Sequence, residues 1–475
     1  MGKRLMKMYV AGQWTIGRDS IDVLNPYDGS VVDTVPRGSA DDVDRALASA
    51  ERGAKVMAEL TGFERYEILH RAGDLILRDQ ESLARMLTQE EGKIISEARF
   101  EVSRAAEILY LSAEEAKRLG AEVIPLDGGP GVKDKFGFTV RVPCGVVAAV
   151  CPFNFPLHLV CHKVGPALAA GNAVVVKPAT DTPLMGVRVI ELLLEAGAPE
   201  EAVHIITGPG SEIGDALVSD PRVRKVTFTG SRDIGERICK AAGIKKVTME
   251  LGSNSAAIVM PDADLDKVAE VLPQTAFANA GQVCISTQRL LATGSVYGDL
   301  IDALKPKVEA IATGDPLDEA TGMGPMIRES DAVRVGEWID EAQAGGAEVL
   351  VGGGRSGQMF EPTLVTNVSP DMRLSCDELF GPAVGVTRVA DIEEAIAISN
   401  DSNYGLSASI FTESLDSAMR FIRDVDSGNI HINWGTQWRT DLMPYGGVKD
   451  SGLGKEGPKY AVEEMTELKM VVMHL

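Results

Sequence analysis

From residue 144 onward, short apolar runs rich in β-branched residues alternate with segments of helical pattern. The runs are Val146–Val150, Ala173–Val176, Val203–Ile206, Lys225–Phe228 and Val247–Met249, and a helical segment at Asp233–Ala242 separates the last two. Runs that are apolar at consecutive positions indicate strands buried on both faces, as in a parallel sheet covered by helices. A second region of this alternation spans about 256–440. The sequence therefore predicts an α/β protein with a doubly wound parallel sheet and a second α/β domain.

The N-terminal part of the chain has a different pattern. Residues 1–37 have the composition of short strands and turns, with turn residues at 25–29. Ser39 then has the features of a helix N-cap, with acidic residues in the first turn and apolar residues at helical spacing after it. Helical patterns continue to about Leu119. We therefore expect short strands followed by several helices before the alternating region.

Two further segments have β-like patterns outside the predicted sheets. The stretches Ala121–Leu126 and Phe136–Val142 flank Gly-rich turns and predict a hairpin over 119–141. The tail Leu468–Met473 is apolar and has no neighbour in sequence with which to pair. An isolated hairpin is marginal in water, and an unprotected edge promotes aggregation. These segments therefore predict a symmetric homo-oligomer in which a partner subunit covers them, against the alternative that the tail pairs within its own subunit.

Composition excludes several classes of protein. The 475 residues suffice for two to four domains at roughly 100–200 residues each. The formal net charge of −22 disfavours binding to nucleic acid, and no apolar run approaches the ~20 residues that span a bilayer. The 6 cysteines include no CxxC pair, which disfavours a disulfide framework or a zinc module. We expect a protein of the reducing cytoplasm, with no membrane or nucleic-acid partner.

Several glycine- and proline-containing motifs follow the predicted strands directly. These are Pro152–Pro156, Lys177–Ala179 and Phe228–Ser231, the last with Gly235 opening a helix. Open parallel sheets bind ligands beyond the carboxyl ends of their strands, and a free helix N-terminus suits a pyrophosphate. The segment Gly208–Ser211 also lies between a strand and a helix, but its proline removes a hydrogen-bond donor, and we interpret it as a simple turn.

One cysteine differs from the other five in its surroundings. Cys284 stands in the polar, Gly-led turn GQVCIS after the helix-like segment Leu272–Ala280. A lone cysteine is usually a small buried hydrophobe, but such a turn favours an accessible thiolate.

Glu250, at the end of another predicted strand, opens the run ELGSNSA. Taken alone, it would be interpreted as a solvated acid at a strand end.

These motifs, in this order and spacing, resemble the aldehyde dehydrogenase superfamily over essentially the whole chain. The resemblance rests on Asn154, on Glu250 in ELGSNSA, on Cys284 in GQVCIS and on ELFGP at 378–382. It implies a Rossmann-type cofactor domain (1–118 and 142–252), an α/β catalytic domain (253–440) and a small β oligomerisation arm (119–141 and 455–475). It also implies a homodimer or homotetramer.

The resemblance implies a hydrolysing mechanism that does not use coenzyme A. Cys284 attacks the aldehyde and forms a thiohemiacetal, whose oxyanion the amide of Asn154 and the N–H of Cys284 stabilise. Hydride transfer leaves a thioester, and Glu250 activates the water that hydrolyses it. A thiol esterase or acyltransferase using Cys284 with a histidine, and a catalytically inactive relative, are the alternatives.

The same resemblance assigns a set of cofactor-binding residues. It places Lys177 on the adenosine ribose, Gly230 and Ser231 at the pyrophosphate, Glu378 on the nicotinamide ribose and Phe380 beside the nicotinamide, and it adds Pro152, Phe153, Leu251 and Gly252 to the cofactor site. Thr180 stands where strictly NAD-using members carry a ribose-binding glutamate. Without that carboxylate a 2′-phosphate meets less repulsion, although the adjacent Asp181 would restore some. The expected cofactor is NAD or NADP.

The substrate is narrowed to a small hydroxy- or anionic aldehyde. The contexts ELGSNSA and WRTDLMPYGG resemble the branch of lactaldehyde, non-phosphorylating glyceraldehyde-3-phosphate and succinate-semialdehyde dehydrogenases. We expect a lactaldehyde- or glyceraldehyde-type substrate, although Val283 replaces the arginine of glyceraldehyde-3-phosphate members. Succinate semialdehyde or another anionic semialdehyde is the alternative. Arg439 is a candidate clamp for the substrate anion, and Arg118 is a second candidate.

His158 and His162 have metal-like spacing on a predicted helix. No carboxylate or third ligand accompanies them in sequence, so we interpret them as structural and expect no metal.

Overall fold

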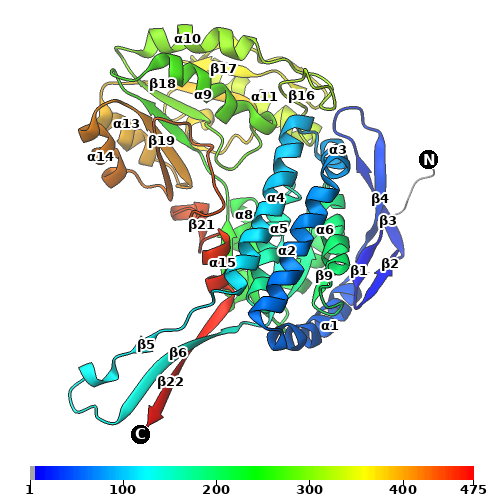
Figure 1. Ribbon diagram of the computed structural model, residues 1–475. Coiled ribbons are helices and arrows are strands. Elements are labelled where there is room, and N and C mark those ends of the chain that lie inside the picture. The colour runs from blue at the N-terminus through cyan, green and yellow to red at the C-terminus, as the bar shows by residue number, and fades with distance from the viewer. Residues whose placement is uncertain (1–5) are drawn as a thin grey trace.

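The computed structural model describes residues 6–475, so the first five residues of the predicted cofactor domain lie outside the described residues. Two sheets form the body, and a slender three-stranded arm projects from it (Figure 1). The larger sheet has the strand order β2-β1-β9-β8-β7-β10-β11-β21. Its strands are β1 (Met8–Val10), β2 (Gln13–Thr15), β7 (Val146–Val150), β8 (Ala173–Lys177), β9 (Val203–Ile205), β10 (Val223–Thr229), β11 (Lys246–Glu250) and β21 (Gly452–Leu453).

The central strands β9, β8, β7, β10 and β11 run parallel and match the predicted apolar runs. Every residue of β7 and β8 is buried, because helices cover both faces of the sheet. These helices are α1 (Ala40–Glu59), α5 (His158–Ala169), α6 (Leu184–Glu195), α7 (Gly210–Ser219) and α8 (Arg232–Ala242). The chain proceeds from β7 to β8 and β9 on one side and then to β10 and β11 on the other. The strand order therefore reverses beside β7, which opens a crevice at the carboxyl ends of β7 and β10.

The N-terminal segment folds as the sequence predicted. Ser39 caps α1 with a capping box shared with Asp42. The hairpin β3 (Asp19–Leu24) and β4 (Val31–Arg37) precedes it, and α2 (Gly62–Arg78), α3 (Gln80–Glu91) and α4 (Ile95–Ala116) follow. In Figure 1 these helices lie against α5 and α6, so α4 extends toward the loops that follow the strands of the larger sheet.

The second sheet has the order β14-β17-β18-β13-β12-β19-β20 and is parallel except for β14 at one edge. Its strands are β12 (Ala256–Val259), β13 (Arg289–Thr293), β14 (Glu348–Val351), β17 (Thr363–Thr366), β18 (Ala383–Val389), β19 (Ser407–Phe411) and β20 (Asn429–Ile432). The helices around it are α9 (Leu265–Phe277), α10 (Tyr297–Glu309), α11 (Glu329–Ala344), α12 (Arg373–Cys376), α13 (Ile392–Asn400) and α14 (Leu415–Asp424), with a small ribbon of β15 (Arg355–Ser356) and β16 (Met359–Phe360). The α/β fold class is thereby confirmed.

The arm corrects one expectation about the tail. The strand β22 (Thr466–His474) pairs antiparallel with β6 (Lys135–Pro143) of the same chain, and β6 pairs with β5 (Val123–Ile124). The predicted hairpin is confirmed, but the argument that the tail lacks a partner in its own chain is wrong. Thr466 of β22 lies 323 positions after its partner Pro143 of β6 (466 − 143), so the pairing was hidden in the sequence.

The segment 455–475 also divides between arm and body. Residues 458–464 form α15 (Pro458–Glu464), which packs against α4 and α5, and only the strand after it extends along the arm (Figure 1). Just before α15, β21 adds an antiparallel edge strand to the sheet of β11. The C-terminal part of the chain therefore reaches the cofactor sheet, the helices around it and the arm in succession.

Candidate functional site

A cavity of about 790 Å³ lies at the carboxyl ends of β7, β8, β10 and β11, where the strand order reverses. The predicted catalytic and cofactor residues all line it: Pro152, Phe153, Asn154, Lys177, Thr180, Gly230, Ser231, Glu250, Leu251, Gly252, Cys284, Glu378 and Phe380. They come from loops of both sheets. The fold therefore brings the sequence motifs together, and the cavity has the size of a small-molecule or cofactor site.

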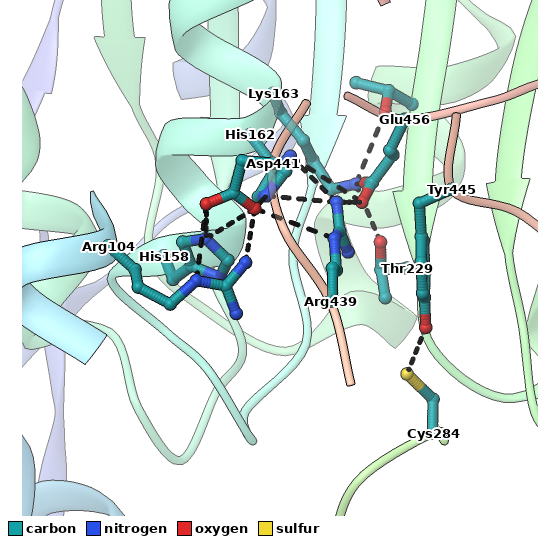
Figure 2. A network of polar contacts seen from close by, with 11 residues as sticks. Arg104, His158, His162, Lys163, Thr229, Cys284, Arg439, Asp441, Tyr445 and Glu456 are labelled. Carbon is teal, nitrogen blue, oxygen red and sulfur yellow. Dashed lines mark hydrogen bonds and ion pairs between the residues drawn. The ribbon is translucent and has the colours of Figure 1, made fainter. Parts of the chain in front are cut away.

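Cys284 lies at the inner part of this cavity, and its surroundings correct one expectation. Its Sγ lies 3.1 Å from the hydroxyl oxygen of Tyr445 (Figure 2). Burial raises the pKa of Cys284 to about 12, although the hydrogen bond with Tyr445 acts in the opposite direction. The side chain is therefore a half-buried thiol in the free protein and not the accessible thiolate that the turn sequence favoured.

The amide of Asn154 points toward the same loop. Its Nδ2 donates to the carbonyl oxygen of Gln282 at 2.9 Å, two residues before Cys284, and the side chain is buried. An amide nitrogen carries two hydrogens, so one N–H remains for another acceptor. The geometry thus places a hydrogen-bond donor beside the thiol.

Glu250 ends β11 as a buried carboxyl without a hydrogen-bond partner among residues 6–475. Burial and the charge of Glu456 raise its pKa well above the usual value. Gly446 permits a close approach here, because a Cβ at that position would lie 2.8 Å from Glu250 Oε1. An unpaired carboxyl with a raised pKa that faces a cavity can exchange a proton with a water molecule or a ligand.

A buried polar network that includes Lys163, Arg439 and Glu456 lies beside the cavity wall (Figure 2). Lys163 Nζ donates to Glu456 Oε1 at 3.0 Å and to Thr229 Oγ1 at 2.7 Å. Arg439 Nη2 contacts Glu456 Oε2 at 3.2 Å, and its guanidinium lies 3.8 Å from the centre of the Tyr445 ring. Burial opposes ionisation of Glu456, but Lys163 and the neighbouring cations hold its pKa well below the usual range. Sequence reasoning missed Glu456 and Tyr445 as parts of the site.

The two histidines have a carboxylate neighbour that their sequence context did not show. Asp441 accepts from His162 Nε2 at 3.1 Å and lies 3.4 Å from His158 Nε2, so the three could hold a metal ion by geometry. Arg104, however, forms an ion pair with the same carboxylate, and Arg439 Nε lies 3.7 Å from it. Two guanidinium groups already compensate the charge of Asp441, and this disfavours a further cation.

The candidate substrate arginines lie outside the cavity lining. Arg439 stands behind the Tyr445 ring in the network just described. Arg118 is exposed beyond the end of α4 and pairs with Glu115, so the structure gives no support for contact with a substrate. Arg104 is the α4 arginine that reaches the network, and nothing in its local sequence distinguishes it from a surface arginine.

The outer part of the cavity has features that suit a dinucleotide. Glu378 Oε1 accepts from the N–H of Ser253 at 2.8 Å, and burial raises the pKa of Glu378 to about 7. A Cβ at Gly252 would lie 2.3 Å from Glu378 Oε2, so only glycine allows this approach. Phe380 packs edge-on against Phe153 at 5.9 Å between ring centres. Ser231 caps α8 without a side-chain hydrogen bond, which leaves backbone donors for a pyrophosphate.

The part of the cavity near Lys177 also contains residues that we had not assigned to the site. Gly210 and Ser211 line the cavity at the start of α7, so our interpretation of Gly208–Ser211 as a simple turn is wrong. The proline only precedes the helix, where a missing N–H costs nothing. Lys177 is buried, which lowers its pKa to about 8, and Asp181 beside Thr180 forms an ion pair with Arg328 of the second domain.

A dinucleotide-sized cavity that ends at a thiol, an amide and a buried carboxyl defines a cofactor-dependent dehydrogenase that works through a cysteine. The hydrogen-bond partner of that cysteine is Tyr445 and not a histidine, which disfavours a thiol hydrolase. The model of the aldehyde dehydrogenase family matches residues 14–471, and the chain belongs to this family. It is an NAD(P)-dependent aldehyde dehydrogenase.

Individual relatives agree with this assignment. The chain is 48% identical over 468 residues to 3-sulfolactaldehyde dehydrogenase of Priestia aryabhattai, covering 98% of each chain. The crystal structure of aldehyde dehydrogenase 21 from Physcomitrella patens, in complex with the product succinate, superposes with a TM-score of 0.97 at 37% identity over 100% of this chain and 99% of that one. The NADP complex of NADP-dependent glyceraldehyde-3-phosphate dehydrogenase from Bacillus halodurans C-125 gives a TM-score of 0.97 at 37% identity and covers 100% of both chains. Among residues 6–475, no helix has the length and hydropathy to cross a membrane.

Proposed function

We propose that the chain oxidises a small anionic aldehyde to its carboxylate through a thioester on Cys284. The Cys284 thiol gives its proton to a water molecule as its sulfur bonds the carbonyl carbon, and the free N–H of Asn154 stabilises the resulting oxyanion. Bound NAD(P)⁺ supplies the hydride acceptor for the next step. The Glu250 carboxylate, whose raised pKa makes it a stronger base, then takes a proton from the water that cleaves the thioester; the carboxylate product and the thiol are released, and Glu250 passes the proton to solvent.

The observation that supports this proposal best is the continuity of one cavity between cofactor-type and nucleophile-type residues. The same space is lined by Ser231 at the start of α8, by Glu378 against Gly252, and by Cys284. A cofactor bound along it would end beside the thiol, as a hydride transfer requires. Glu250, whose oxygens have no protein partner among the described residues, has room to accept a water proton.

Electrostatics and the relatives support an anionic substrate. Behind the thiol, the cationic side chains of Arg104, Lys163 and Arg439 face the carboxylates of Asp441 and Glu456. Three positive charges oppose two negative ones in this buried network, so it attracts a negative group. The relatives named above act on sulfolactaldehyde or glyceraldehyde 3-phosphate or bind succinate, all of which are anionic. We infer a three- or four-carbon aldehyde with an anionic end, and propose Arg439 and Arg104 as the source of its attraction.

The test compares small aldehydes with and without an anionic group. Initial rates of reduced-cofactor formation at 340 nm are measured with 3-sulfolactaldehyde, lactaldehyde, glyceraldehyde 3-phosphate and succinate semialdehyde, each with NAD⁺ and NADP⁺. We expect at least tenfold higher kcat/KM for 3-sulfolactaldehyde than for lactaldehyde, which lacks the charge, and no increase on adding coenzyme A. Equal values for the charged and uncharged aldehydes would contradict the substrate class. A Cys284→Ser variant that still reduced the cofactor would contradict the mechanism.

We also propose that the protein is a symmetric homo-oligomer in the cytoplasm. The arm projects from the body (Figure 1), and Val123, Phe136, Leu468 and Met470 on it are exposed, an apolar surface that a partner subunit would cover. All 6 cysteines are free thiols, which suits a reducing compartment. Sedimentation should give a dimer or tetramer, and deletion of residues 466–475 should give aggregates or inactive monomers. A monomeric, active full-length chain at micromolar concentration would refute the oligomer.

A further inference from the structure

Lys93, in the loop between α3 and α4, contacts the Asn154 loop from the side opposite the cavity. Its side chain is buried, and its Nζ donates to the carbonyl oxygen of Asn154 at 2.7 Å and to Glu101 Oε2 at 2.7 Å. The ammonium also lies 4.0 Å from the centre of the Phe155 ring. We propose that Lys93 is a positioning residue that fixes the amide of Asn154 for oxyanion stabilisation.

The Asn154 amide is also held from the nucleophile side, and the contacts close a ring. Asn154 Nδ2 donates to the carbonyl of Gln282 at 2.9 Å, and the N–H of Gln282 donates to the carbonyl of Asn279 at 3.0 Å. Asn279 Nδ2 in turn donates to Asn154 O at 3.2 Å and to Glu91 Oε1 at 2.9 Å. Glu91 Oε2 accepts the N–H of Lys93 at 3.0 Å. One buried ring therefore sets the position of the amide relative to the loop that carries the thiol.

The backbone of this loop needs such support. Asn279 and Ala280 have φ values of 50° and 53°, in the left-handed region that costs energy for residues other than glycine. Glu97 accepts the backbone N–H of Asn279 at 3.1 Å, and Glu91 holds its side chain. The backbone conformation of Asn279 and Ala280, a few residues before Cys284, is thus maintained by carboxyl groups that also lie close to Lys93.

The neighbouring carboxyl groups stabilise the charged form of Lys93. Burial alone would lower the pKa of Lys93, but Glu101 and Glu91 raise it above the usual value, so the side chain is an ammonium ion. Glu101 Oε1 accepts the N–H groups of Leu157 and His158 at 3.0 and 3.1 Å, at the start of α5. Lys93 therefore connects the first turn of α5 to the Asn154 carbonyl, and both contacts restrict the loop between them.

If Lys93 had a purely structural role, it would only neutralise the charge of Glu101. The paired substitution Lys93→Met with Glu101→Gln separates the two roles, because it leaves no unpaired charge and keeps an amide oxygen to cap α5. Besides the Lys93–Glu101 pair itself, it removes the hydrogen bond to the Asn154 carbonyl and the contact of the ammonium with the Phe155 ring. The matched control is Lys225→Met, which deletes another buried lysine that bonds Thr248 Oγ1 at 2.6 Å and lies outside the cavity lining.

The experiment is a double-mutant cycle on the single-turnover rate of reduced-cofactor formation. The Lys93/Glu101 pair is introduced with Asn154 present and into Asn154→Ala, and each variant is assayed for cofactor Kd and thermal unfolding. We expect about a 30–100-fold lower rate with Asn154 present, as for a displaced catalytic group, and less than about threefold in Asn154→Ala. Cofactor Kd should stay within about twofold, and Lys225→Met should keep the wild-type rate. If the neutral pair does not fold, Lys93→Arg carries the same test, since its planar fork keeps the charge but displaces the donor.

The inference about Lys93 rests on the oxyanion role proposed for Asn154. The variants of the cycle distinguish a failure of the one from a failure of the other. Equal losses with and without Asn154, an unchanged rate in the Lys93/Glu101 pair, or an equal loss in Lys225→Met would overturn the role of Lys93 while leaving the proposed function intact. An unchanged rate in Asn154→Ala itself would refute the oxyanion role and the inference together. The Cys284→Ser assay tests aldehyde oxidation independently of both.

Discussion

Substitution of Arg328 by glutamine should turn the cofactor preference away from NADP. Arg328 precedes α11 in the second domain and forms an ion pair with Asp181, the neighbour of Thr180 in the cavity wall. With Arg328 present, the charge of Asp181 is compensated, and the site tolerates a 2′-phosphate. Without it, a carboxylate that is 31% exposed repels each nearby unit of negative charge by about 1–2 kcal/mol, between the values for water and for a protein surface. This corresponds to about a 5–30-fold increase in the Kd of NADP.

The assay is fluorescence titration of NAD⁺ and NADP⁺ into four proteins: wild type, Arg328→Gln, Asp181→Asn and the double variant. Arg328→Gln should weaken NADP and leave NAD within about twofold, because NAD carries no 2′-phosphate. The double variant should regain most of the NADP affinity, since the uncompensated carboxylate is gone. Equal weakening of both cofactors, or no recovery in the double variant, would refute this reasoning and assign Arg328 a direct contact with the cofactor or a role in the fold.

Three further predictions test other parts of the site. Glu250→Gln should keep a burst of reduced cofactor and lower the steady-state rate at least tenfold, whereas equal losses in both phases, measured by stopped flow, would place Glu250 in acylation. Thr180→Glu should weaken NADP much more than NAD in the same titration, and an unchanged ratio would place the 2′-position elsewhere. Burial raises the pKa of Glu90 and of Glu91 to about 8, so folding binds protons and stability should fall as pH rises from about 4.5 to 8. Urea unfolding of Glu90→Gln should show a flatter profile in that window, and an identical slope would contradict the assignment.

The parallel sheet made much of the site predictable from sequence. A motif follows each of these apolar runs, and the carboxyl ends of parallel strands lie at the same edge of the sheet. Once the strands were assigned, four motif residues therefore had to lie close together: Asn154, Lys177, Ser231 and Glu250. The polar turn around Cys284 singled this residue out, but only the family resemblance placed it beside the others. The sequence predicted a doubly wound sheet but not the order of its strands, which the structure supplies.

The remaining features depend on contacts between distant segments. Arg104 and Asp441 are 337 positions apart in sequence. Nothing in the sequence around Asp441 indicates that its carboxylate is buried beside two histidines. The pairing of β22 with β6 is equally remote in sequence. The state of Cys284 was predicted incorrectly because a polar turn sequence says nothing about the Tyr445 side chain and the second domain, which bury the thiol.

Burial opposes ionisation of both reacting groups of the site in the free protein, and this links catalysis to the cofactor cavity. It raises the pKa of Cys284 to about 12 and that of Glu250 well above its usual value. Each ionises more readily when a positive charge enters the cavity that both line. An oxidised nicotinamide ring carries such a charge. We therefore expect Cys284 to be more nucleophilic once an oxidised cofactor occupies the outer part of the cavity, between Glu378 and Phe380.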